Sequence, residues 1–154
     1  METVLRDFTV YQANMNDVVI NEIMADPSPP VGLPEWEYIE LFNTTDFSID
    51  LADWSLVIGT SVKVLPPMML APEGYLVVCK EEAVDVLSDA SPICGFSSFS
   101  IANAGALIQL FSSDGALVSE VHFSDTWYRD AEKKEGGWSL EQIDPWHPCA
   151  GQRN

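Results

Sequence analysis

Short runs of alternating apolar and polar residues, separated by Gly, Pro, Asn and Asp, recur along the chain and restrict its fold more than any other feature. Alternation with a period of two is typical of strands, because successive side chains point to opposite faces of a sheet. Helical spacing is nearly absent, and only residues 81–90 predict one or two helical turns, with Val84, Leu87 and Val86 facing inward. We predict an all-β sandwich of about eight or nine strands, eight of them at residues 17–24, 37–43, 54–59, 62–66, 74–79, 106–112, 116–123 and 138–143.

The sequence predicts the geometry of one turn between these strands. Asp114-Gly115 lies between two alternating runs, and this dipeptide suits a tight hairpin that requires positive φ angles. We therefore expect Ala106–Phe111 to pair with Leu117–Phe123.

The chain length and the net charge limit the classes of function that this protein can have. A chain of 154 residues with 47% hydrophobic content suits one folded domain, which we place at residues 17–148, with a lead-in or linker at 1–16 and a truncated linker at 149–154. The net charge of −17, from 7 basic and 24 acidic residues, argues against nucleic acid as a partner, because its phosphates attract a basic surface. No run of 18 apolar residues occurs, so we expect no membrane insertion by this segment.

Residues 21–43 crowd acidic side chains around aromatic ones. Alternation along 37–43 places Ile39 and Leu41 on the buried face and Glu40 on the outer face. A catalytic carboxylate pair needs a fixed separation across a substrate, and no second carboxylate is evident at such a place. We interpret these acids as a solvated strand face, on which Glu37→Gln has little effect on stability.

The same stretch resembles a known family. The run "VVINEIMADPSPPVGLPEWEYIELFNTTDFSIDLADWSL" is similar to the lamin tail domain in its bacterial form, and "SIANAGALIQLFSSDGALVSEVHF" continues the pattern. The resemblance covers Val18 to Pro148 and implies an immunoglobulin-like β-sandwich. It further implies a module of larger exported or surface-attached proteins, which would be extracellular, periplasmic or on the cell surface, with no catalytic residues to transfer.

The C-terminal part, residues 127–148, combines aromatic and basic side chains, which are enriched where binding energy concentrates. The candidate interaction patch consists of Trp127, Tyr128, Arg129, Lys133, Lys134 and Trp146. The alternative is that these tryptophans only cap the sandwich. Alternation along 138–143 predicts a last strand at a sheet edge with Trp138 and Leu140 as a buried pair, and the core is expected to hold Ile39, Leu41, Trp54, Trp138 and Leu140.

Motifs for catalysis or cofactors are missing from the sequence, so we expect no enzyme activity and no cofactor. "GWSLE" lacks the second glycine of a nucleophile elbow, and "NAGA" lacks the lysine of a phosphate-binding loop. A calcium site remains an alternative, since Asp46, Asp50 and Asp53 share a loop and Asp114 lies in a hairpin.

Cys79, Cys94 and Cys149 do not form a C-x-x-C pair. One disulfide with a free thiol and three reduced thiols both remain open.

The function predicted is a non-catalytic immunoglobulin-like interaction or structural module, with a protein or a cell-surface glycan as its partner. Two alternatives stay open. One is a calcium-dependent hydrolase that uses acids between Asp26 and Glu40, and the other is a carbohydrate-binding module that uses Trp127, Tyr128 and Trp146.

Overall fold

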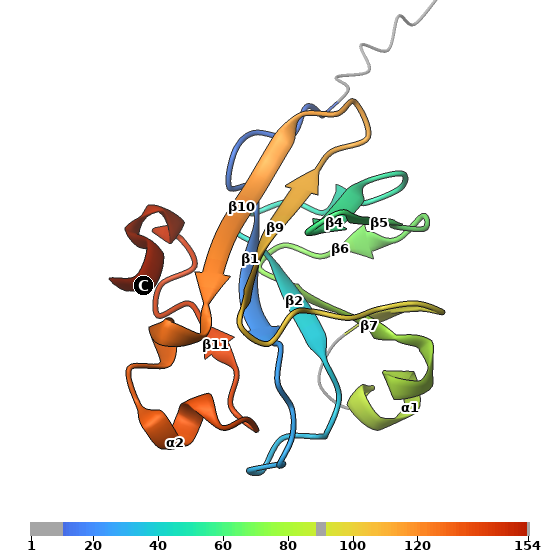
Figure 1. Cartoon of the computed structure of the whole chain (residues 1–154). Coiled ribbons are helices and arrows are strands. Elements are labelled where there is room, and N and C mark those ends of the chain that lie inside the picture. Colours follow the sequence, from blue (N-terminus) through green and yellow to red (C-terminus); the bar gives the residue numbers. More distant parts are fainter. Residues whose placement is uncertain (1–10, 89–91, 154) are drawn as a thin grey trace, which may run out of the picture.

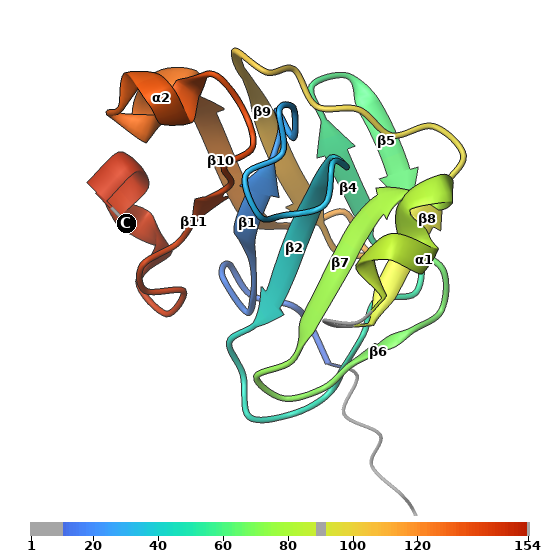
Figure 2. The ribbon, with the colours of Figure 1, turned by 90° about the horizontal axis from the view of Figure 1, so that it is seen from below.

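The protein is a two-sheet β-sandwich in a computed structural model that describes residues 11–88 and 92–153 (Figure 1). One sheet has five strands in the order β11-β1-β2-β7-β8, and the facing sheet has four in the order β10-β9-β4-β5. A two-stranded ribbon, β3-β6, accompanies them. Seen from below, the five-stranded sheet lies in front, with α1 beside β7 and β8 and the C-terminal segments beside β11 and β1 (Figure 2).

The five-stranded sheet consists of β1 (Val18–Met24), β2 (Tyr38–Asn43), β7 (Tyr75–Lys80), β8 (Ile93–Phe96) and β11 (Leu140–Glu141). The four-stranded sheet consists of β4 (Ser55–Ile58), β5 (Ser61–Val64), β9 (Gly105–Phe111) and β10 (Leu117–Ser124), and the ribbon of β3 (Ile49–Asp50) and β6 (Met69–Leu70). The helical turns are η1 (Glu81–Ala83), α1 (Val84–Leu87), η2 (Asp125–Tyr128), α2 (Ala131–Lys134) and η3 (Pro148–Arg153). Within the described ranges, none of these helices has the length and apolar character needed to cross a bilayer.

All eight predicted strands have a counterpart in the structure, so the all-β sandwich is confirmed. The predicted hairpin is also present: β9 and β10 pair antiparallel, and Gly115 has a φ of 84° in the turn between them. The helical turns predicted at 81–90 are η1 and α1, which end at Leu87 and link β7 to its parallel neighbour β8, while positions 89 and 90 lie outside the described residues. A parallel pair needs such a crossover connection, because a tight turn reverses the chain direction. Val86 does not face inward as expected, since it is 52% exposed.

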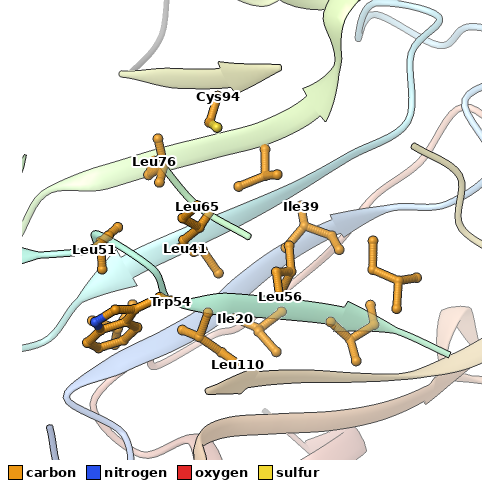
Figure 3. Packing of buried hydrophobic residues seen from close by; sticks show 14 of the residues in the cluster. Ile20, Ile39, Leu41, Leu51, Trp54, Leu56, Leu65, Leu76, Cys94 and Leu110 are labelled. Atoms are coloured by element: carbon orange, nitrogen blue, oxygen red, sulfur yellow. The ribbon is translucent and has the colours of Figure 1, made fainter. Parts of the chain in front are cut away.

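The main core lies between the two sheets (Figure 3). Ile39 and Leu41 are fully buried there, and Trp54 is only 3% exposed, so these three residues occupy the core positions expected for them. A second, smaller cluster covers the outer face of the five-stranded sheet, where α1 packs Val84 and Leu87 against it.

All three cysteines are free thiols. Cys94 is paired with Val78 in the register of β7 and β8, whereas Cys79 is paired with Gly95. Side chains one position apart along a strand point to opposite faces, so Cys94 enters the main core and Cys79 the second cluster. Burial raises the pKa of both thiols, that of Cys79 to about 11. Of the two alternatives left open, the structure therefore favours reduced thiols.

Trp54→Ala should lower the free energy of unfolding by about 3–5 kcal/mol, because it leaves a large cavity between the sheets. Val62→Ala on β5, whose side chain is 57% exposed, is the matched control and should change it by less than about 0.5 kcal/mol. Urea denaturation measures both changes in unfolding free energy. It is followed by far-ultraviolet circular dichroism, because the fluorescence signal would change with the loss of Trp54. Equal effects at the two positions would contradict the core assignment.

Candidate interaction surface

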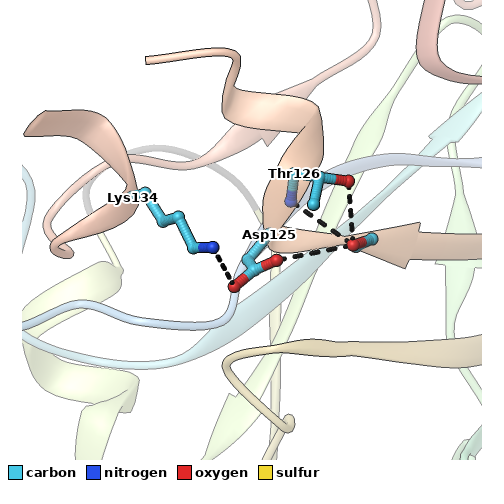
Figure 4. A network of polar contacts seen from close by, with 4 residues as sticks. Asp125, Thr126 and Lys134 are labelled. Carbon is cyan, nitrogen blue, oxygen red and sulfur yellow. Dashed lines mark hydrogen bonds and ion pairs between the residues drawn. The ribbon is translucent and has the colours of Figure 1, made fainter. Parts of the chain in front are cut away.

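The chain beyond β10, here called the tail, comprises residues 125–153 and follows one edge of the sandwich (Figure 1). Its short helices are held by their own caps. The Oγ of Ser124 accepts from the amide of Thr126 at the start of η2, and the Oδ1 of Asp130 accepts from the amide of Glu132 at 2.8 Å at the start of α2. The Nζ of Lys134 lies 3.0 Å from the Oδ2 of Asp125, which ties α2 to η2 (Figure 4).

Two glycines dock the tail onto the proline-rich loop after β1. Gly136 and Gly137 have φ angles of 111° and 80°, and a side chain at either position would collide with a loop carbonyl oxygen, of Ser28 and Pro29 respectively. The amide of Gly137 donates to the carbonyl oxygen of Asp26 at 2.8 Å. Glycine is required here by conformation and by space, so the pair is a packed contact and not only a flexible turn.

Next, β11 pairs antiparallel with β1 and forms the edge of the five-stranded sheet. The amide of Gln142 donates to the carbonyl oxygen of Asn21 at 2.8 Å, and its Nε2 donates to the carbonyl oxygen of Ile20 at 3.0 Å. Edge pairing was expected for residues 138–143, but only Leu140–Glu141 form a strand.

The prediction of a buried pair at Trp138 and Leu140 is half wrong. Leu140 is half-buried against the main core, whereas Trp138 is 38% exposed. Trp138 lies before the strand begins, at the end of the glycine turn, so the alternation that was used to place it does not reach it. Its ring is instead covered by the Nζ of Lys133, 4.8 Å from the ring centroid.

The predicted interaction patch is divided between two places. Trp127 and Tyr128 are half-buried in η2, where the hydroxyl of Tyr128 donates to the carbonyl oxygen of Trp138 at 2.8 Å. Trp146 instead packs edge-on against Phe42, with ring centroids 5.2 Å apart, and its Nε1 donates to the carbonyl oxygen of Thr44 at 3.3 Å.

The remaining members of the patch, Arg129, Lys133 and Lys134, are exposed on and before α2. Both interpretations of the tail tryptophans thus hold in part, because Trp127 caps the core while Trp146 keeps an exposed fraction of 54%.

A row of three glutamates crosses the outer face of the five-stranded sheet, and sequence reasoning missed it. Glu22 on β1 is the register partner of both Glu40 on β2 and Glu141 on β11. Like charges directly opposite one another destabilise a sheet. Burial, together with the charges of Glu22 and Glu141, raises the pKa of Glu40, although a hydrogen bond from the Nδ2 of Asn21 opposes the shift.

The interpretation of these acids as a solvated strand face is therefore wrong for Glu40, which is half-buried. It is also wrong for Glu37. Its Oε1 accepts from the amide of Ile101 at 2.9 Å, and burial raises the pKa of its carboxyl. The acids come together through the strand register, which depends on the distant pairing of β11 and cannot be inferred from residues 21–43 alone.

A hollow of about 580 Å³ opens where β1 and β11 of one sheet meet β10 of the other, and the tail forms its remaining wall. Asn21 and Gln142 line it, and the buried side-chain oxygens Oδ1 and Oε1 of these two residues meet no hydrogen-bond donor in the described part of the chain. An unsatisfied buried acceptor costs about 1–3 kcal/mol. Both oxygens are closed off from solvent, so they are buried unpaired groups beside the hollow.

A second hollow, of about 700 Å³, brings together Asp50, Asp53 and Asp114, three of the four residues weighed for calcium. Asp50 accepts from the amide of Ala52, and a hydrogen bond from Ser112 lowers the pKa of Asp114, so these acids serve turns. Among residues 11–88 and 92–153, no three acidic, histidine or cysteine side chains converge in a way that could hold a metal ion.

The sandwich matches a known protein family. Residues 11–125 match the model of the lamin tail domain, which is most of the chain. The chain belongs to the lamin tail domain family. This lamin tail domain is an immunoglobulin-like β-sandwich, as the resemblance implied. A search of curated proteins found no match.

The lamin tail domain match ends at Asp125, where β10 has just finished. Both the glutamate row and the first hollow therefore combine residues of the matched segment with residues of the tail, namely Glu141 for the row and Gln142 for the hollow. Neither feature belongs to the matched segment alone.

The glutamate row predicts a pH-dependent gain from Glu40→Gln. The raised folded-state pKa means that ionisation of Glu40 disfavours the folded state, so stability falls as the pH rises above the ordinary glutamate value of 4.5. Glutamine removes the charge and keeps an oxygen for Asn21. We expect a gain of about 0.2–1 kcal/mol at neutral pH that disappears below about pH 4.

Unfolding free energies measured across this pH range check the prediction, with Glu135→Gln, at an exposed position after α2, as the control. A loss of stability in Glu40→Gln at neutral pH, or an equal gain in the control, would show that the row carries no repulsion.

Proposed function

We propose that this lamin tail domain is a non-catalytic interaction or structural module of a larger bacterial protein that is exported or attached to the cell surface. Its place of action is extracellular, periplasmic or the cell surface, in line with the context that the family resemblance implies. The immunoglobulin-like fold supports a module of this kind.

The tail supplies the observation that carries the proposal. Three large apolar side chains within nine residues are exposed on a strongly acidic protein: Trp138 at 38%, Ile143 at 82% and Trp146 at 54%. Trp146 is held in place by Phe42 and Thr44, so its exposed part is presented on a fixed base. Rigid, partly exposed aromatic side chains are typical anchors of interfaces.

The glutamates on the outer face of the five-stranded sheet lack the arrangement that a hydrolase requires. Glu22 and Glu40 are half-buried on the outer face of the five-stranded sheet, and neither hollow described above includes them. A hydrolase would have to bring its substrate between two carboxylates at a fixed separation. Because Glu22 accepts from the hydroxyl of Tyr38 at 2.7 Å and Glu40 from Asn21 at 3.0 Å, each carboxylate already has a structural partner.

Site-specific photo-crosslinking in the cells from which the sequence comes tests the module directly. A photoreactive amino acid at position 146 should give a discrete adduct with one partner, because this side chain is exposed on a fixed base. The same group at Val62, exposed to a similar extent on β5, should not. Protease added to intact cells should degrade the adducts, and a protease inhibitor should preserve them, as expected for a partner outside the cytoplasm.

The proposal fails if positions 146 and 62 give the same adducts, or if the adduct is protected from protease in intact cells. Turnover by the purified domain in a hydrolase assay that EDTA abolishes would favour the alternative of a calcium-dependent hydrolase. Bound calcium would also raise the stability, by about 2.7 kcal/mol at a hundred times its Kd.

A further inference from the structure

The outer face of the five-stranded sheet is covered at one end only. There, α1 and the second cluster cover Tyr38 and Val77. At the other end Phe42 on β2 is the register partner of Tyr75 on β7, and neither belongs to that cluster. Tyr75 is 40% exposed, and Trp146, which lies beside Phe42, is 54% exposed. This end of the face therefore presents two aromatic rings to solvent.

Both exposed rings rest on the same buried side chain. Phe42 is 1% exposed, and its ring centroid lies 4.7 Å from that of Tyr75 and 5.2 Å from that of Trp146. The faces of aromatic rings attract cations, because the π electrons make them negative. The same interaction occurs within the domain, where the Nζ of Lys133 covers the ring of Trp138. A cationic side chain from a partner would meet two such rings on a fixed base.

The charged side chains that share this face are acidic. Alternation along β11, β1 and β2 places Glu141, Glu22 and Glu40 on it. Alternation turns Lys80, at the end of β7, away from this face, and its Nζ pairs with Glu82 at 3.4 Å. In the described part of the chain, the glutamate row takes part in no ion pair. The face therefore offers negative charge that no basic side chain offsets.

The rings and the glutamates form one surface. Burial raises the pKa of the Tyr75 hydroxyl, and the charges of Glu40, Glu141 and Glu73 raise it further, so these carboxylates lie within electrostatic reach of the ring. Glu141 is exposed, and among the described residues its carboxylate has no hydrogen-bond partner. The hydrogen bonds of Glu22 and Glu40 use one oxygen of each. The row thus keeps carboxylate oxygens for a partner.

We propose that this face binds an arginine-bearing segment of a partner protein. The guanidinium group stacks on the ring of Trp146 or Tyr75 and pairs with Glu141. Arginine suits the surface better than lysine, because its planar group stacks on rings and forms two parallel hydrogen bonds to a carboxylate. A second copy of this chain is disfavoured as the occupant, since two molecules of net charge −17 repel each other. The inference rests on the proposed function, because it names the chemistry of the module's partner.

A nuclear magnetic resonance titration of the whole 154-residue chain tests the surface at about 0.15 M salt, where distant charges are screened. The probes are blocked Gly-Arg, Gly-Lys and Gly-Glu repeat peptides of equal length. The arginine peptide should shift the indole signal of Trp146 and the backbone amide signals of Tyr75 and Glu141 along one saturable curve. The lysine peptide should bind about threefold more weakly. The glutamate peptide should give no saturable shift.

Glu141→Gln removes one charge of the row and should weaken binding of the arginine peptide about threefold, as expected for one ion pair at a surface. Glu135→Gln is the matched control, because it removes the same charge from an exposed position after α2. It should bind the peptide as the wild type does. A general attraction between the peptide and an acidic protein would instead affect both variants alike.

Trp146→Leu removes the exposed ring but keeps an apolar side chain. It should weaken binding of the arginine peptide about threefold, read from the amide signal of Tyr75. Trp138→Leu removes the other exposed tryptophan of the tail and should bind as the wild type does. The comparison of Glu141→Gln with Glu135→Gln does not depend on the folding of either tryptophan variant.

The proposal is overturned if the arginine peptide gives no saturable shift at Trp146 or Tyr75, if Glu141→Gln and Glu135→Gln bind it equally, or if a folded Trp146→Leu binds as tightly as the wild type. Equal or tighter binding of the lysine peptide would overturn the assignment to arginine. An adduct at position 146 in cells without binding of the arginine peptide would keep the module and reject only this partner chemistry. Binding of the peptide without an adduct would reject the proposed function and keep the surface.

Discussion

The pairing of β11 with β1 is the interaction on which both surface features of this domain depend. A β-sandwich has open edges, and here one pair of edges meets where β1 and β11 approach β10. The tail closes this side by adding β11 to the sheet and by placing Trp127 and Leu140 against the main core. Three backbone carbonyls of the chain from Ile20 to Asp26 receive hydrogen bonds from the tail. Removing the tail would leave those carbonyls and part of the apolar core facing water.

Local rules of sheet stability are broken at this junction. β1 carries a register shift between Ile20 and Glu22, which is the geometry of a β-bulge. The bulge leaves the amide of Ile20 to donate to the Oγ of Ser119 on β10, and it places Asn21 beside Glu40. The result is a set of destabilising features in one small region: three glutamates in a row and two unpaired amide oxygens. Natural proteins concentrate such violations at sites of function.

Sequence reasoning reached the fold because its signals are local. Alternation located eight strands, and Asp114-Gly115 determined the β9–β10 pairing through turn chemistry alone. β3 and β6 were missed because two residues are too few to show a period, and β8 was missed because its four residues, Ile-Cys-Gly-Phe, include no polar side chain that would mark alternation. The error at Trp138 arose because alternation was extended past the end of the strand.

The site depended on longer-range information. Glu22, Glu40 and Glu141 are separated widely along the chain, and only the register of three strands puts them in one row. The prediction of a single tail patch failed for a related reason, since the tail turns back after β11 and carries Trp146 to Phe42. The hollow could not have been found from residue types, because neither Asn21 nor Gln142 stands out until its amide nitrogen is seen to be occupied and its oxygen is not.

The central claim, that the tail is an integral part of the sandwich, is tested most directly by the hydrogen exchange of two amides in the intact domain. The amides of Gly137 and Gln142 donate to Asp26 and Asn21 in the docked tail. Both should exchange at least about tenfold more slowly than in an unstructured peptide, and Gly136→Ala should speed both together by forcing the turn off the proline-rich loop. Exchange at the unstructured rate in the wild-type domain would show that the tail is a separate arm, and would remove the structural basis of the glutamate row and of the hollow.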